Sequence, residues 1–146
     1  MGEVGKGTMN NRDAAADTRR LAEEAVRVLL EKKARAVCMY YVREITSVTD
    51  YHINVTGRSA SHVASLSDDC AERIEQALGR APLRVEGRGE RAWILVDYGD
   101  VIVNVFDEAS RDFYKLDRLF PAECAEDITA LREEVDRKFD ITVKEI

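Results

Sequence analysis

The sequence has no long apolar run, few prolines and no pattern of paired cysteines. No stretch reaches the roughly 18 consecutive apolar residues of a membrane-spanning helix. Residues 1–12 are rich in glycine and polar residues, and they lack the apolar region of a secretory signal. The cysteines, Cys38, Cys70 and Cys124, are odd in number and widely spaced, which predicts neither a disulfide framework nor a CxxC metal site. We therefore expect a cytoplasmic protein, in a reducing compartment, without a metal or another cofactor.

The composition is typical of a single acidic domain. The chain has 146 residues, of which 45% are hydrophobic and two are proline, so it can bury one core but hardly two. It carries 28 acidic residues against 22 Lys and Arg, which gives a formal net charge of −6. This balance argues against free DNA as the main partner, because binding to phosphates requires clustered Lys and Arg. It suits a basic protein partner, since opposite fields speed encounter.

Hydrophobic periodicity predicts helices that alternate with strands. Helices are expected at residues 13–33, 60–78, 110–120 and 122–139, and strands at 34–42, 50–56, 83–86, 92–96 and 101–106. Gly79 is expected to end the second helix, and Pro121 breaks the third. The order of elements predicts an α/β fold with a mixed sheet and helices packed on it. We divide the chain into a flexible leader (1–12), a single domain (13–121) and a C-terminal helical extension (122–146).

Two stretches carry a specific combination of motifs. One begins with EG at 86–87 and continues through WILVDYGDVIVNVF (93–106) to RDFYKLDRLF (111–120). The other is TDYHINVTGRS (49–59), followed by SHV (61–63). With this combination the sequence resembles the ribosomal silencing factor family, also called Iojap-like proteins, over residues 18–121. It departs from the family pattern in a more polar second strand at 52–54 and at single positions: Ser61 replaces the usual Arg, Asn104 the usual His and Phe120 the usual Trp.

The resemblance implies a binding protein and not an enzyme, with a fold similar to that of nucleotidyltransferases. Members of the family dock on the large ribosomal subunit, against the basic ribosomal protein number fourteen on the intersubunit face. Their presence there keeps the small subunit from joining, and translation is repressed under nutrient limitation. The free protein is also compatible with a homodimer, because an exposed apolar patch tends to find a partner.

We expect the contact with the ribosomal protein to lie on the last strand pair and the helix after it. Residues 97–118 hold six acidic and three basic side chains, an excess of negative charge that would suit a basic protein. Trp93 shares a strand face with Asp97, which favours exposure over a place in the core. Phe113 is expected in the core, and Tyr114 points about 100° away from it around the helix. The expected contact residues are Trp93, Asp97, Tyr98, Asp100, Arg111, Tyr114 and Leu119.

Two other interpretations remain open, one for the turn residues Asp97 and Asp100 and one for the function of the whole protein. Asp97 and Asp100 could serve only to accept hydrogen bonds from the backbone of their turn. The segment 56–59, Thr-Gly-Arg-Ser, is similar to the Gly-Ser turn of nucleotidyltransferases, so the alternative function is an enzyme acting on a nucleotide substrate. Such chemistry needs closely spaced carboxylates that hold metal ions. The next acids, Asp68 and Asp69, are consecutive in a predicted helix and point about 100° apart.

Overall fold

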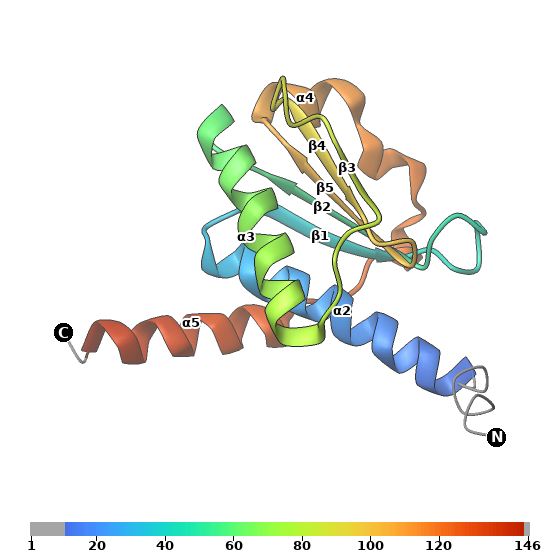
Figure 1. Cartoon of the computed structure of the whole chain (residues 1–146), viewed down its shortest axis with the longest axis horizontal. Coiled ribbons are helices and arrows are strands. Elements are labelled where there is room, and N and C mark those ends of the chain that lie inside the picture. Colours follow the sequence, from blue (N-terminus) through green and yellow to red (C-terminus); the bar gives the residue numbers. More distant parts are fainter. Residues whose placement is uncertain (1–10, 145–146) are drawn as a thin grey trace.

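The computed structural model describes residues 11–144, which form one sheet with helices on both of its faces (Figure 1). The strands are β1 (Arg35–Tyr41), β2 (Tyr51–Thr56), β3 (Arg84–Glu86), β4 (Trp93–Asp97) and β5 (Val101–Phe106). The helices are α2 (Asn11–Glu31), α3 (Ala60–Leu78), α4 (Glu108–Tyr114) and α5 (Thr129–Lys144), with short 3-10 helices η1 (Leu116–Leu119) and η2 (Ala122–Cys124). The predicted single α/β domain with a mixed sheet is confirmed.

The five strands lie in the order β1-β2-β5-β4-β3. All neighbours are antiparallel except β2 and β5, which run parallel and place Asn54 opposite Asn104. A parallel pair needs a crossover connection, and the chain between β2 and β5 supplies it with α3 and the β3–β4 hairpin. Gly99, with φ of 90°, makes the tight turn between β4 and β5, as expected from a position that favours glycine.

One face of the sheet forms the hydrophobic core with α2 and α3. Alternate strand residues point to this face and meet the apolar stripes of the two helices, whose buried members include Leu21, Leu29, Val63 and Ile74. The bounds of α3 have local causes. Its N-cap Ser59 accepts a hydrogen bond from the backbone of His62, and Gly79 ends it in the left-handed conformation. In Figure 1, α2 and α3 lie on one side of the sheet, and α4 lies on the other.

Three sequence predictions need correction near the C-terminus. The helix predicted for 110–120 ends at Tyr114, because Lys115 turns left-handed with φ of 52°. Phe113 is therefore not in the core but 76% exposed. The helix predicted from residue 122 begins at Thr129, whose backbone N–H donates to the Asp127 carboxylate at 2.9 Å.

Of the leader predicted for 1–12, residues 1–10 lie outside the described residues, and 11 and 12 belong to α2.

The last helix, α5, packs mainly against α2 (Figure 1). Among residues 129–140 of this helix, Leu131 and Val135 are buried, and they are spaced by one helical turn. An ion pair between Arg27 of α2 and Glu134 of α5, at 2.8 Å, accompanies this apolar contact. The start of the extension at residue 122 stays a prediction, and α5 is in close contact with the remainder of the domain.

Candidate protein-binding surface

The sheet face opposite α2 and α3 carries polar and aromatic side chains, and we call it the open face. Strand alternation and the observed register assign to it Cys38, Tyr40, His52, Asn54, Thr56, Trp93, Leu95, Asp97, Ile102, Asn104 and Phe106. The segment formed by α4 and η1 covers part of it: Tyr114 of α4 stacks on Trp93, and Asp117 of η1 bonds Asn54. The open face is thus polar in its middle and aromatic along one side.

A chain of hydrogen bonds crosses the open face from β4 to η1. The indole N–H of Trp93 donates to Asn104 Oδ1 at 3.1 Å, and Asn104 Nδ2 donates to Asn54 Oδ1 at 3.0 Å. Asn54 Nδ2 then donates to Asp117 Oδ1 at 2.9 Å. Arg111 of α4 completes the chain, with its Nε 2.6 Å from Asp117 Oδ2. Four elements, β4, β5, β2 and η1, are therefore tied together, and Arg111 adds α4.

The carboxylate of Asp117 is ionised in this chain. Burial acts to raise its pKa, but the hydrogen bonds from Arg111, Asn54 and Tyr40 outweigh burial and hold the pKa below its usual value. The Tyr40 hydroxyl is 2.8 Å from the carboxylate, and burial followed by this contact raises the pKa of the phenol. Tyr40 therefore stays neutral and donates, and Asp117 accepts from every partner.

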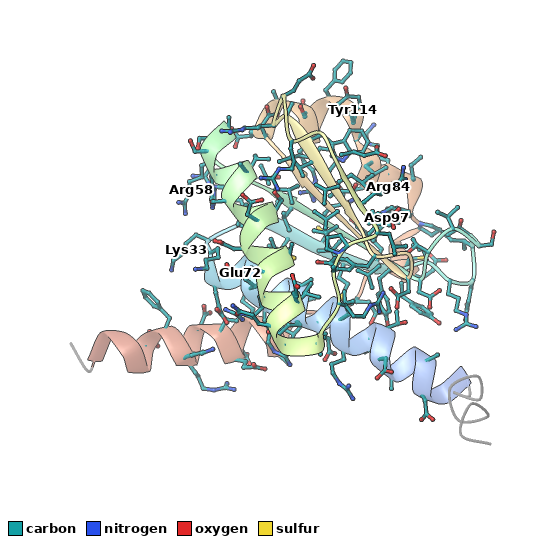
Figure 2. The ribbon with its side chains drawn as sticks, viewed as in Figure 1. Lys33, Arg58, Glu72, Arg84, Asp97 and Tyr114 are labelled. Atoms are coloured by element: carbon teal, nitrogen blue, oxygen red, sulfur yellow. The ribbon has the colours of Figure 1, made fainter. Side chains whose placement is uncertain are left out.

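Aromatic rings form a continuous ladder beside the hydrogen-bonded chain. Phe106 contacts Trp93, Trp93 contacts Tyr114, and Tyr114 contacts Phe113, with ring centroids 4.9, 4.9 and 5.1 Å apart. Exposure rises along the ladder, from a buried Phe106 through a half-buried Trp93 to Tyr114 at 53% and Phe113 at 76%. Figure 2 shows Tyr114 projecting from the α4 end of the molecule. The ladder connects an exposed aromatic edge to the interior of the domain.

The structure brings together some of the predicted contact residues. Trp93 and Tyr114 touch each other, and Leu119 of η1 is 68% exposed. Arg111 lies on this side of the sheet but is mostly buried, since it is occupied by Asp117 and Thr56. Asp97 lies at the far end of β4, beside Arg84 (Figure 2), and its carboxylate accepts from the Gly99 backbone N–H at 2.7 Å. The turn-stabilising role considered for Asp97 is thus observed.

Tyr98 and Asp100 lie outside the open face: Tyr98 is buried, which contradicts its prediction as a contact residue, and contact of Asp100 with a partner stays a prediction. Tyr98 follows Asp97 in the turn, so its side chain points to the opposite side of the sheet, where it is 2% exposed within the core. Asp100 accepts two hydrogen bonds from Arg80, at 2.9 and 3.1 Å, and one from Thr18 of α2 at 2.7 Å. Both residues stabilise the packing of α2 and α3.

The predicted local excess of negative charge is largely neutralised. Four of the six acids pair with arginine: Asp97 with Arg84, Asp100 with Arg80, Glu108 with Arg35 and Asp117 with Arg111. A fifth, Asp107, caps α4 by accepting from the backbone of Ser110. The sixth, Asp112, is exposed near the equally exposed Lys115 and Arg118. Residues 97–118 therefore do not form a patch of unpaired negative charge, and the net charge of −6 belongs to the whole chain.

Sequence reasoning missed the roles of Asn54, Asn104 and Asp117. A signal was present in β5, where Asn104 interrupts a strand that is otherwise apolar, and Asn54 lies at the facing position of β2. Three departures from the family pattern, at residues 52, 54 and 104, meet here: Asn104 Nδ2 lies 3.1 Å from His52 Nδ1 and bonds Asn54. A fourth departure, Phe120, stacks on His52 with a centroid distance of 4.9 Å. These four departures are linked by hydrogen bonds and by the His52–Phe120 ring contact, whereas the fifth, Ser61, belongs to α3.

Other predicted features also have defined positions. Asp68 pairs with Arg88 at 2.7 Å, and Asp69 lies 3.9 Å from Lys32, so the two carboxylates face different neighbours. Within residues 11–144, no three His, Cys, Asp or Glu side chains are grouped so that they could hold a metal ion. No helix in the described part of the chain is both long and apolar enough to span a membrane.

Fold and surface together define a small α/β domain with a hydrogen-bonded, partly aromatic sheet face. A family model described as "Ribosomal silencing factor during starvation" matches residues 15–145, and the chain belongs to this family. The ribosomal silencing factor RsfS of Halalkalibacterium halodurans is 30% identical over 100 residues, covering 68% of this chain and 85% of that protein. RsfS of Zymomonas mobilis is 35% identical over 75 residues, 51% of this chain, and the match spans only 56% of the Zymomonas protein.

The fold is also similar to that of solved structures. The crystal structure of a Chromobacterium violaceum protein superimposes with a TM-score of 0.67 at 29% identity, and the match covers 69% of this chain and 83% of that one. The family match extends over α5, which lay outside the resemblance seen at residues 18–121.

Proposed function

We propose that this protein binds the large ribosomal subunit and blocks joining of the small subunit, and so represses translation under nutrient limitation. Its contact on the subunit is the basic ribosomal protein number fourteen. Membership of the ribosomal silencing factor family supports action on the ribosome. The observation that carries the proposal is the aromatic ladder on the open face, with its exposed end at Phe113 and Tyr114.

The ladder has the properties of a protein contact. Aromatic side chains are enriched in interfaces and include many of the residues that dominate binding energy. Trp93 is held between Phe106 and Tyr114 and bonded to Asn104. A ring fixed before binding loses little conformational entropy when the partner arrives, which favours affinity. Leu119, at the end of η1, adds exposed apolar surface on the same side of the domain.

Charge supports the choice of a basic partner. The net charge of −6 gives the whole molecule a field that attracts a basic surface and speeds association. A domain seated on the intersubunit face would occupy volume that the small subunit needs. Silencing by this route requires no chemical step, only occupancy.

The test is co-sedimentation on a sucrose gradient with separately purified large and small subunits from the same organism. We expect the protein to migrate with large subunits and not with small ones. Added before the subunits are mixed, it should lower the yield of joined ribosomes in proportion to its occupancy. If it stays at the top of the gradient with large subunits present, the proposal is wrong.

The enzyme alternative can be tested on the same preparation. A nucleotide that binds the folded state raises the melting temperature in proportion to its affinity. The proposal predicts no such rise with a nucleoside triphosphate and magnesium. A rise of several degrees would contradict the binding-protein interpretation and would favour a nucleotidyltransferase-like enzyme.

A further inference from the structure

The amide of Asn104 sits at the centre of the open face with each of its polar atoms engaged. The residue is 1% exposed. Its Oδ1 accepts from the Trp93 indole, and its Nδ2 donates to Asn54 Oδ1 and lies 3.1 Å from His52 Nδ1. A primary amide has two N–H donors, and both have an acceptor here.

The donor and acceptor of each hydrogen bond are fixed by the two groups at the ends of the hydrogen-bonded series, Asp117 and Trp93. Asp117 is an ionised carboxylate and only accepts, so Asn54 must turn its amino group toward it. The carbonyl oxygen of Asn54 then faces Asn104, which must offer its own amino group. The carbonyl of Asn104 is left facing Trp93, whose indole only donates. Flipping either amide would break the chain at both of its neighbours.

We propose that Asn104 is a positioning residue for Trp93, and that with Asn54 it holds the indole N–H inward and the ring in place for the partner. The inference rests on the proposed function, because it concerns the same surface. Rotation of the indole away from Asn104 would leave a buried carbonyl without a donor, which disfavours the rotated form by roughly one to two orders of magnitude. The partner therefore meets the ring of Trp93 and not its N–H group.

The experiment uses the fact that Trp93 is the only tryptophan in the chain. Its indole gives a single N–H resonance in a nitrogen–proton correlation spectrum, and the exchange of that proton with deuterated solvent reports the Trp93–Asn104 bond. The test variant is Asn104→Leu, which has similar size but no amide. The control is Ser67→Ala, which removes a buried hydroxyl from α3 on the opposite face. Affinity for large subunits is measured on the same variants by sedimentation.

We expect indole exchange to be about tenfold faster in Asn104→Leu than in the parent, and affinity for large subunits to fall about fivefold or more. Ser67→Ala should match the parent in both measurements. Parent-like exchange in folded Asn104→Leu would overturn the inference, and so would faster exchange with unchanged affinity. Rapid indole exchange in the parent itself would overturn it without any variant.

Two further outcomes separate this inference from the proposed function. If Asn104→Leu does not fold, Asn54→Leu replaces it, since that change leaves the Trp93–Asn104 bond but removes the next link. Its indole exchange should then exceed that of the parent, and an unchanged rate would overturn the inference. If the parent does not bind large subunits, the proposed function fails, and the exchange rates alone decide whether Asn104 positions Trp93.

Discussion

Asp97 and Tyr98 are adjacent in sequence, yet their side chains lie on opposite sides of the sheet. The two tyrosines that sequence analysis grouped together therefore have different roles. Tyr98 lies in the core with α2 and α3, and Tyr114 lies at the exposed end of the aromatic ladder. One substitution should act through folding and the other through binding.

Tyr98→Ala should reduce the free energy of unfolding by about 3 kcal/mol or more, as expected when a large buried ring is removed. Tyr114→Ala should reduce it by about 1 kcal/mol or less, because that ring is 53% exposed and loses mainly its stacking on Trp93. Urea unfolding followed by circular dichroism measures both. Equal losses would mean that Tyr98 is not in the core.

His52 gives the open face a dependence on pH. Burial lowers its pKa from the ordinary 6.5, with Asp97 opposing the shift, so folding favours the neutral ring, whose Nδ1 faces the Asn104 amide. Its contribution to stability is complete above pH 6.5 and is lost as the pH falls through the lower pKa of the folded state. Between pH 7.5 and 5.5 this residue should lower the free energy of unfolding by up to about 1.4 kcal/mol.

The matched control is His52→Phe, which keeps a ring beside Phe120 but cannot be protonated. Urea unfolding at the two pH values should show a smaller loss of stability in the variant than in the parent. The carboxylates of Asp97 and Asp117 and the second histidine, His62, are common to both proteins, so their effects cancel in the difference. An identical pH dependence would show that His52 does not titrate as inferred.

At the scale of elements, the break between α4 and η1 brings Asp117 into the hydrogen-bonded chain. Lys115 takes φ of 52° at the end of α4, and its backbone N–H bonds the Arg111 carbonyl at 3.2 Å. This turn redirects the chain, so that the Asp117 carboxylate meets the Arg111 guanidinium. A left-handed conformation in a residue other than glycine costs about 1 kcal/mol.

Lys115→Gly should therefore raise the free energy of unfolding by about 0.5–1 kcal/mol, after the greater freedom of glycine in the unfolded chain is subtracted. The exposed Lys115 side chain has little other structural role to lose. Lys115→Ala is the control, because it removes the charge but keeps the strain. Unfolding midpoints in urea decide the comparison, and a stability gain in Lys115→Ala equal to that of Lys115→Gly would contradict this account.

Elements with local signals were predicted well, and those set by tertiary contacts were not. The bounds of α3 and β5 match the prediction, since Ser59 and Gly79 mark the ends of α3 and a largely apolar run marks β5. The end of α4 depends on the left-handed turn at Lys115 and on the contact between Arg111 and Asp117, which are six residues apart. Hydrophobic periodicity shows neither of these features. The start of α5 was placed too early. Residues 122–124 form a separate 3-10 helix, and the helix that packs on α2 begins only at Thr129.

For the whole molecule, the sequence pointed to β4, β5 and α4 but missed that β1, β2 and η1 also form the open face, and it did not show how the residues combine. Alternation along β4 correctly separated Trp93 from the core residues beside it. The hydrogen-bonded chain escaped prediction, because Asn54 and Asn104 face each other only through the parallel register of β2 and β5. That register results from a long crossover, and no local pattern specifies it. The charges of residues 97–118 were likewise counted correctly but paired in ways that only the fold determines.

The last prediction compares how much an exposed aromatic side chain and an exposed charge contribute to binding of large subunits. Tyr114→Ala removes an exposed aromatic anchor, and truncation of such a residue typically weakens binding by about 2 kcal/mol or more. Asp112→Ala changes one exposed charge in a nearly balanced group, against a net charge of −6 for the chain. It should therefore reduce the affinity for large subunits by less than about twofold and act mainly on association rate. Sedimentation at two salt concentrations measures both variants. If Asp112→Ala weakens binding as much as Tyr114→Ala, local charge and not the ladder dominates the contact.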